Sequence, residues 1–177
     1  MAVIRPARAG DLVRLRAVER AAGGVFRDIG MGPVADDEPL TVSDLAGYQQ
    51  DGRAWVAVDE QDRPVAYLLI DRVGNGAHVE QVSVHPDHAR QGVGLALIDT
   101  AVIWAARHNL AALTLTTFRE VPWNAPYYTR VGFRVMTEDQ MTSSLCRIRE
   151  HEAARGLARW PRVTMRRPIT RPVPPSG

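Results

Sequence analysis

The sequence predicts an α/β (α+β) domain in which a mixed sheet is flanked by helices. Three observations support this class: strand-like and helix-like segments alternate along the chain, a hairpin pattern lies near its middle, and a long apolar helix follows a β-branched strand. The length of 177 residues suits one domain with one core. We expect this domain to span residues 1–166 and the proline-rich residues 167–177 to form a loose tail.

The first half of the chain is predicted to hold three strands and two helices. Apolar residues recur at the helical period over Asp11–Ala22, which indicates an amphipathic helix that ends at the following glycines. Gly30–Leu40 contains prolines and an acidic cluster and is predicted to be a loop. Ser43 is the candidate cap of a short helix that runs to Gln50. Strands are expected at Val3–Arg5, Ala54–Val58 and Pro64–Asp71, the last two forming the hairpin.

The second half is predicted to alternate strands and helices. Val93–His108 is apolar around most of its circumference, which is typical of a helix buried against a sheet. Pro126 suits the first turn of a short helix that Gly132 closes. A further helix is expected over Leu145–Arg155, before Gly156. The remaining strands are expected at His78–His85, Ala112–Thr117, Phe133–Met136 and Val163–Arg166.

Composition excludes several classes of protein. The net charge is +2 and no dense basic run exists, so we expect no nucleic-acid partner. All 22 basic residues are arginine, which removes any mechanism that uses a lysine nucleophile. The single cysteine, Cys146, is expected to be a small buried hydrophobe, and the five histidines do not fall at metal-ligand spacings with it. No signal peptide and no apolar stretch of about 18 residues is present, so we expect a cytoplasmic protein without membrane contact.

The most informative segment is the loop Ala89–Gly94, which lies between a β-branched strand and the long helix. The first turn of a helix presents backbone N–H groups without helical partners and the positive end of the helix dipole. Glycines at positions 92 and 94 let a diphosphate approach this backbone. The third glycine of a dinucleotide fingerprint is absent, and no Gly-Lys-Ser/Thr exists. The loop predicts a diphosphate site, and an ordinary helix start is the alternative.

Two separated segments resemble the GNAT superfamily of N-acetyltransferases. Ala89-Arg90-Gln91-Gly92-Val93-Gly94 is similar to the family signature Gln/Arg-x-x-Gly-x-Gly/Ala, with Ala89 in place of the first residue. Asn124–Phe133 resembles the family segment Asn…Tyr-x-x-x-Gly-Phe. The resemblance covers roughly residues 2–166. It implies a mixed, mostly antiparallel central sheet of six or seven strands flanked by helices, and acetyl-CoA as cosubstrate, with no metal.

The same resemblance assigns roles to individual residues. Tyr128 is the candidate acid, because a phenol of pKa about 10 can protonate a thiolate of pKa about 8.5 or above; packing in the core is the alternative. Glu80 is the candidate base, expected beside apolar walls that raise its pKa; a solvated strand-end glutamate or a group that holds water is the alternative. The implied coenzyme A-binding residues are Val82, Ser83, Val84, Arg90, Gln91, Gly92, Val93, Gly94, Leu95, Asn124 and Tyr128.

The reaction implied is direct attack of a primary amine on the thioester in a ternary complex, without a covalent acyl-enzyme. We expect a small amine as acceptor, and the acidic first loop would draw in a cationic one; an ordinary solvated loop is the alternative. A protein N-terminal or lysine acetyltransferase, a catalytically silent acetyl-CoA-binding module and a homodimer are left open. A phosphate-loop nucleotide enzyme is disfavoured by the missing lysine. The acidic residues of this loop are Asp28, Asp36, Asp37 and Glu38.

Overall fold

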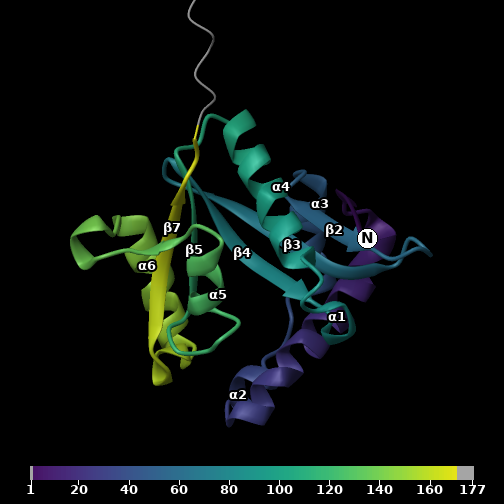
Figure 1. Ribbon diagram of the computed structural model, residues 1–177, viewed down its shortest axis with the longest axis horizontal. Helices are drawn as coiled ribbons and strands as arrows, with labels where there is room; N and C mark the ends of the chain where they lie inside the picture. The colour runs from purple at the N-terminus through teal and green to yellow at the C-terminus, as the bar shows by residue number, and fades with distance from the viewer. Residues whose placement is uncertain (1, 171–177) are drawn as a thin grey trace, which may run out of the picture. The chain divides into compact units, whose positions relative to one another are not determined.

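The computed structural model describes residues 2–170 and contains a seven-stranded sheet in the order β1-β2-β3-β4-β5-β7-β6 (Figure 1). β4 and β5 pair in parallel, whereas the pairs β1–β2, β2–β3, β5–β7 and β6–β7 are antiparallel. This confirms the mixed, mostly antiparallel sheet implied by the sequence. The strands are β1 (Val3–Pro6), β2 (Ala54–Val58), β3 (Pro64–Val73), β4 (Gly76–Val84), β5 (Ala112–Phe118), β6 (Arg134–Val135) and β7 (Arg162–Pro168).

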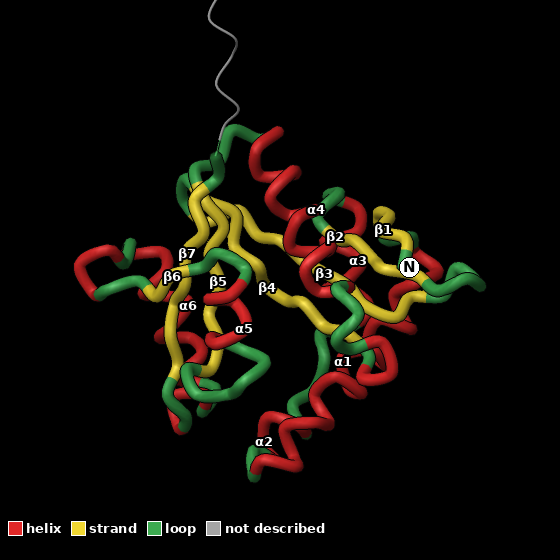
Figure 2. The backbone as a smooth tube through the Cα atoms, viewed as in Figure 1, coloured by secondary structure: helices red, strands yellow, loops and turns green. Residues whose placement is uncertain are grey.

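The chain divides into two compact units. Unit 1 comprises Met1–Asp71 and Glu80–Thr100, and unit 2 comprises Arg72–Val79 and Ala101–Gly177. Both β4 and α4 therefore contribute residues to each unit. Figure 2 shows the helical segments in red and the strands in yellow. The α-helices are α1 (Leu12–Gly24), α2 (Gly32–Ala35), α3 (Val42–Gln50), α4 (Val93–Arg107), α5 (Ala125–Arg130) and α6 (Ser143–Ala154).

The core of unit 1 forms where α1 and α3 bury apolar residues with those of β2 and β3. Leu15 and Val18 of α1 and Leu45 of α3 are fully buried in one cluster with strand residues such as Val56 and Leu69. The apolar stripe predicted for the first helix is thus the face that it buries. Burial of each such side chain contributes about 1.5–3 kcal/mol to folding, before the entropy cost of ordering it.

A buried ion pair holds the start of α1 against β1. Asp11 is 8% exposed and accepts two hydrogen bonds from Arg5, from Nη1 at 2.8 Å and from Nη2 at 3.1 Å. The backbone N–H of Arg8 donates a third at 2.7 Å. Burial opposes the charge on Asp11, but the hydrogen bonds from Arg5 and Arg8 outweigh it and lower the pKa of the carboxyl.

In unit 2, β5 and β7 run side by side over their whole lengths (Figure 1), from Ala112↔Pro168 to Phe118↔Arg162. One face of this pair is apolar, with Leu113 and Met165 fully buried. The opposite face is polar: Thr116 donates a hydrogen bond to Glu152 of α6, and Arg162 Nε donates to the same carboxylate at 3.1 Å. α6 is therefore attached to the sheet largely through polar contacts.

Several local predictions were wrong. The segment predicted as a loop over Gly30–Leu40 contains α2, with Pro33 in its first turn. Thr41, not Ser43, caps α3, because its hydroxyl accepts from Asp44 N at 3.1 Å while the Asp44 carboxylate accepts from Thr41 N at 3.1 Å. Cys146, predicted to be buried, is exposed.

The last strand is longer than the sequence pattern indicated. β7 begins at Arg162 and continues to Pro168, because its backbone pairs with β5 as far as Ala112. Two residues of the stretch predicted as a tail, 167 and 168, are thus strand. Residues 171–177 of that stretch lie outside the described residues.

Candidate functional site

The loop before α4 has a backbone conformation that suits anion binding. Arg90 and Gly92 have φ values of 61° and 78°, and α4 begins at Val93. The N–H of Ala96 donates to the carbonyl of Gly92 at 3.0 Å, so the N–H groups of the three residues between them precede the helical ladder. Arg90, Gln91, Gly92 and Leu95 are exposed. Successive N–H groups at an exposed helix start form an anion-binding concavity.

The chain between β4 and this loop is held next to β3 by a backbone hydrogen bond. The N–H of His85 donates to the carbonyl of Val65 in β3 at 2.8 Å, and the turn Pro86–His88 then leads to the loop. Ser83 is 4% exposed and accepts from Gln81 Nε2 at 2.7 Å. The side chains of Val82 and Val84 are half-buried. The predicted coenzyme A-binding residues of β4 and of the loop, 82–84 and 90–95, therefore all belong to unit 1.

The surroundings of Glu80 differ from those predicted. Its side chain is exposed on β4, which favours the alternative of a solvated glutamate over the expected apolar walls. The pKa values of Tyr48 and Tyr67 in unit 1 are raised, first by burial and then by nearby carboxylates. Glu80 is one of these carboxylates. Tyr48 Oη donates to Asp71 at 3.0 Å.

Sequence reasoning missed a hydrogen-bonded chain on the same unit. Tyr67 of β3 is fully buried, and its hydroxyl donates to the carboxylate of Glu19 on α1. Ser83 also acts on the Tyr67 hydroxyl and lowers its pKa slightly against the effect of burial, and Gln81 donates to Ser83. Glu19 follows Leu15 by four residues and so continues the buried stripe of α1. A carboxylate at that helical spacing was the available signal.

In unit 2, α5 carries the remaining predicted residues. Asn124 occupies the N-cap position, but its side chain makes no capping hydrogen bond; its carbonyl accepts from Tyr128 N at 3.0 Å. The half-buried ring of Tyr128 lies edge-on to Tyr127 at 5.3 Å and to Phe133 at 5.7 Å between centroids. Burial and then the proximity of Tyr127 raise its pKa.

The Tyr128 hydroxyl hydrogen-bonds to no residue in the described range 2–170. The ring packing expected as the alternative is thus observed, and the role of the hydroxyl as proton donor stays a prediction. Glu80 and residues 82–95 belong to unit 1, whereas Asn124 and Tyr128 belong to unit 2.

Ion pairs with arginines neutralise part of the negative charge of the acidic first loop. Glu38 forms ion pairs with Arg16 at 3.3 Å and Arg20 at 3.0 Å, and Asp36 pairs with Arg27. These exposed pairs remove much of the uncompensated negative charge that was expected to attract a cationic acceptor.

A glycine turn at a helix start, preceded by a β-branched strand and followed downstream by Tyr-x-x-x-Gly-Phe, is the pattern on which the resemblance to N-acetyltransferases rests. The chain belongs to the Acetyltransferase (GNAT) family, whose sequence model matches residues 26–133. None of the helices described is long and apolar enough to cross a bilayer.

Two curated relatives are peptidyl-lysine acetyltransferases by name. The Peptidyl-lysine N-acetyltransferase YjaB of Escherichia coli (strain K12) is 32% identical over 81 residues, covering 46% of this chain and 49% of the relative. The protein of the same name from Salmonella typhimurium is 28% identical over 91 residues, covering 51% and 57%. The chain thus spans about half the length of the curated relatives it matches.

Solved structures share the fold along the whole chain. A GNAT-family acetyltransferase from Staphylococcus aureus Mu50 matches with a TM-score of 0.73 at 12% identity, covering 96% of this chain and 100% of that one. The PaiA N-acetyltransferase of Thermoplasma acidophilum, solved in complex with coenzyme A, matches with a TM-score of 0.66 at 13% identity, covering 95% and 99%. At these identities the similarity shows the fold.

Proposed function

We propose that the protein transfers an acetyl group from acetyl-CoA to a primary amine by direct attack in a ternary complex. The observation that carries this proposal is the exposed turn of Arg90–Gly92 at the start of α4, in a chain that belongs to the GNAT family. The backbone N–H groups of residues 92–95 would hold the pyrophosphate of the cosubstrate. Val82, Ser83, Val84 and Asn124 are the further proposed contacts to coenzyme A.

Tyr128 is the proposed proton donor to the departing sulfur. Its raised pKa keeps the phenol protonated over the neutral to mildly alkaline pH range, in which the acceptor amine begins to lose its proton. The same raised pKa makes complete transfer to a free thiolate uphill, so its main contribution is a hydrogen bond that strengthens as charge develops on the sulfur. A hydroxyl without a protein partner suits this role, because no existing hydrogen bond has to be broken.

The amine must lose a proton before or during its attack on the thioester carbonyl. We propose that Glu80 receives this proton, directly or through water. Its exposure on β4 favours the route through water over a buried carboxylate of strongly raised pKa.

We consider two classes of acceptor amine, which a single assay can compare. A small amine is the first candidate, although the ion pairs of Asp36 and Glu38 weaken the electrostatic case for a cationic one. A lysine side chain of a protein is the second, supported by the names of the two curated relatives described above.

The first experiment measures cosubstrate binding. Coenzyme A at a 100-fold excess over its Kd should stabilise the protein by about 2.7 kcal/mol, while ATP and NAD should not. The second measures thiol release from acetyl-CoA with polyamines, amino acids, aminoglycosides, lysine peptides and peptides with free N-termini. No stabilisation by coenzyme A overturns the proposal; stabilisation without acetylation of any amine identifies a silent binding module instead.

A further inference from the structure

A row of polar residues crosses unit 2 on one face of the sheet. His78 of β4 pairs in register with Thr114 of β5, Thr114 with Arg166 of β7, and Arg166 with Arg134 of β6. Residues directly opposite one another in a sheet point to the same face. His78 and Thr114 are buried and their side chains are 2.9 Å apart, whereas Arg166 is half-buried and Arg134 is exposed. The row thus ends, at the edge strand, in two arginines whose backbone positions face each other.

Another arginine of β7 shows what such side chains contact elsewhere in unit 2. Arg162 lies two rows further along the same face, opposite Phe118, and its Nε lies 3.1 Å from the carboxylate of Glu152 on α6. Within residues 2–170, by contrast, neither Arg134 nor Arg166 forms an ion pair or side-chain hydrogen bond. Like charges directly opposite one another destabilise a sheet, so the pair is unfavourable unless something else compensates it.

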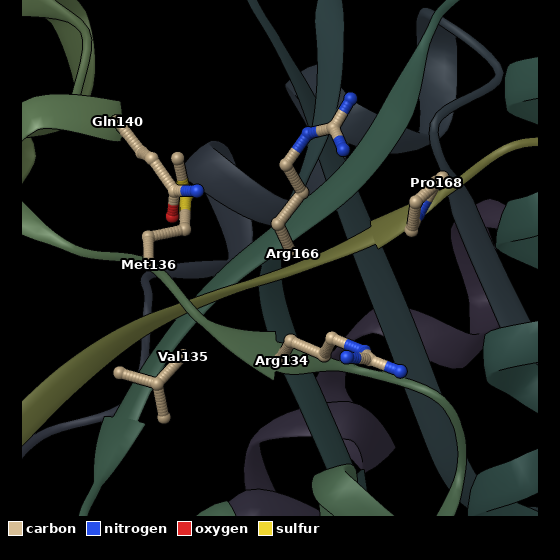
Figure 3. Close-up of a pocket in the computed structure, with 6 residues that line it drawn as sticks. All are labelled: Arg134, Val135, Met136, Gln140, Arg166 and Pro168. Carbon is tan, nitrogen blue, oxygen red and sulfur yellow. The ribbon is translucent and has the colours of Figure 1, made fainter.

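The two arginines line a cavity of about 420 Å³ together with Val135, Met136, Gln140 and Pro168. Figure 3 shows the guanidinium groups diverging from their facing positions on the two strands. The Gln140 side-chain oxygen accepts from Thr137 N at 3.0 Å, which leaves its NH₂ group as the free end of the amide. Glu138 and Asp139 precede Gln140 but do not line the cavity, and Asp139 accepts from the Thr137 hydroxyl. The polar side chains of the lining therefore offer donors.

We propose that this cavity binds a small dianionic ligand, a phosphate monoester or a dicarboxylate, through Arg134, Arg166 and Gln140. Two guanidinium groups match two negative charges, and arginine hydrogen-bonds phosphate and carboxylate oxygens in the same forked geometry. The volume suits a metabolite-sized molecule. The site lies within unit 2 and is independent of the proposed acetyl transfer.

The test uses inorganic phosphate and succinate as probes, and acetate as a monoanionic comparison. Thermal unfolding and calorimetry in low-salt buffer compare the full chain with Arg134→Met and Arg166→Met. The control is Arg147→Met, which removes an exposed arginine of α6 whose side chain contacts Ser144. Because residues 90–95 form a proposed diphosphate site as well, binding is assigned by the difference between these variants.

We expect a dianion to stabilise the unmodified protein more than acetate does. Arg134→Met or Arg166→Met should weaken that binding about tenfold or more, while Arg147→Met should not. Without ligand, Arg134→Met should raise the unfolding midpoint, because it relieves the repulsion across the strand pair. An effect of phosphate alone identifies a phosphate ligand, and an effect of succinate alone a dicarboxylate. The proposal is overturned if neither dianion stabilises the protein, or if all three variants respond alike.

Discussion

Replacing Tyr128 by phenylalanine should separate catalysis from folding. The hydroxyl that is removed bonds to no residue in the described part of the chain, while the ring contacts with Tyr127 and Phe133 remain. The free energy of unfolding should therefore change by no more than about 0.5 kcal/mol. Loss of a positioned proton donor should lower kcat/KM about 100- to 10,000-fold, which corresponds to about 2.7–5.4 kcal/mol of transition-state stabilisation.

The assay follows free thiol released from acetyl-CoA in the presence of the best acceptor of the panel, over pH 6–10. Urea unfolding of the same samples gives the stability of each variant. Tyr127→Phe is the matched control, since it removes a neighbouring hydroxyl from the same helix, and it should retain nearly full turnover. Coenzyme A binding should be little changed in both variants.

A Tyr128→Phe enzyme with more than half of the normal kcat/KM would refute the reasoning, because the hydroxyl would then have no part in the transition state. A large loss of both stability and turnover would refute it in another way, by showing that the hydroxyl has a structural partner.

Three further predictions concern the framework around the site. Tyr67→Phe breaks the hydrogen bond to Glu19 in a fully buried position and should cost about 1.5–3 kcal/mol in urea unfolding; an unchanged midpoint would show that the pair contributes nothing. Asp11→Asn should cost about 2 kcal/mol at pH 7. Because the folded pKa of Asp11 lies below its ordinary value of 3.8, this difference should shrink as the pH falls from there through the folded pKa, and a cost that is constant down to pH 2 would contradict the ion pair with Arg5. Gly132→Ala should cost about 1–2 kcal/mol, since φ is +98° and the new methyl group would lie 3.4 Å from Arg167; a neutral effect on the thermal midpoint would exclude strain there.

Elements with a strong local pattern were predictable from the sequence. β2 occupies the predicted Ala54–Val58, because a run of five apolar residues lies between two polar turns. α4 begins at the predicted Val93, where a glycine turn meets a long apolar helix. Here local propensity and tertiary packing favour the same structure.

Features that depend on contacts between distant segments were not predictable. Glu19 and Tyr67 lie 48 positions apart and meet only when α1 packs on β3. Glu80 is exposed although both its β4 neighbours are at least partly buried, and the apolar residues around it in the sequence did not reveal this. Thr41 and Ser43 are both good caps by residue type, and only the reciprocal bond with Asp44 selects the threonine.

The use of arginine and never lysine as the cation of the framework ion pairs has a consequence at alkaline pH. Acceptor amines become nucleophilic by losing a proton at alkaline pH, where the ammonium groups of lysine (pKa about 10.4) also begin to lose their charge. The guanidinium groups that hold Asp11, Asp71 and Glu152 keep theirs. Nor do side chains of this sequence offer a primary amine to a reactive thioester. The framework thus offers no lysine amine to the acetyl donor that it is proposed to handle, and its arginine charges persist at the pH that favours the reaction.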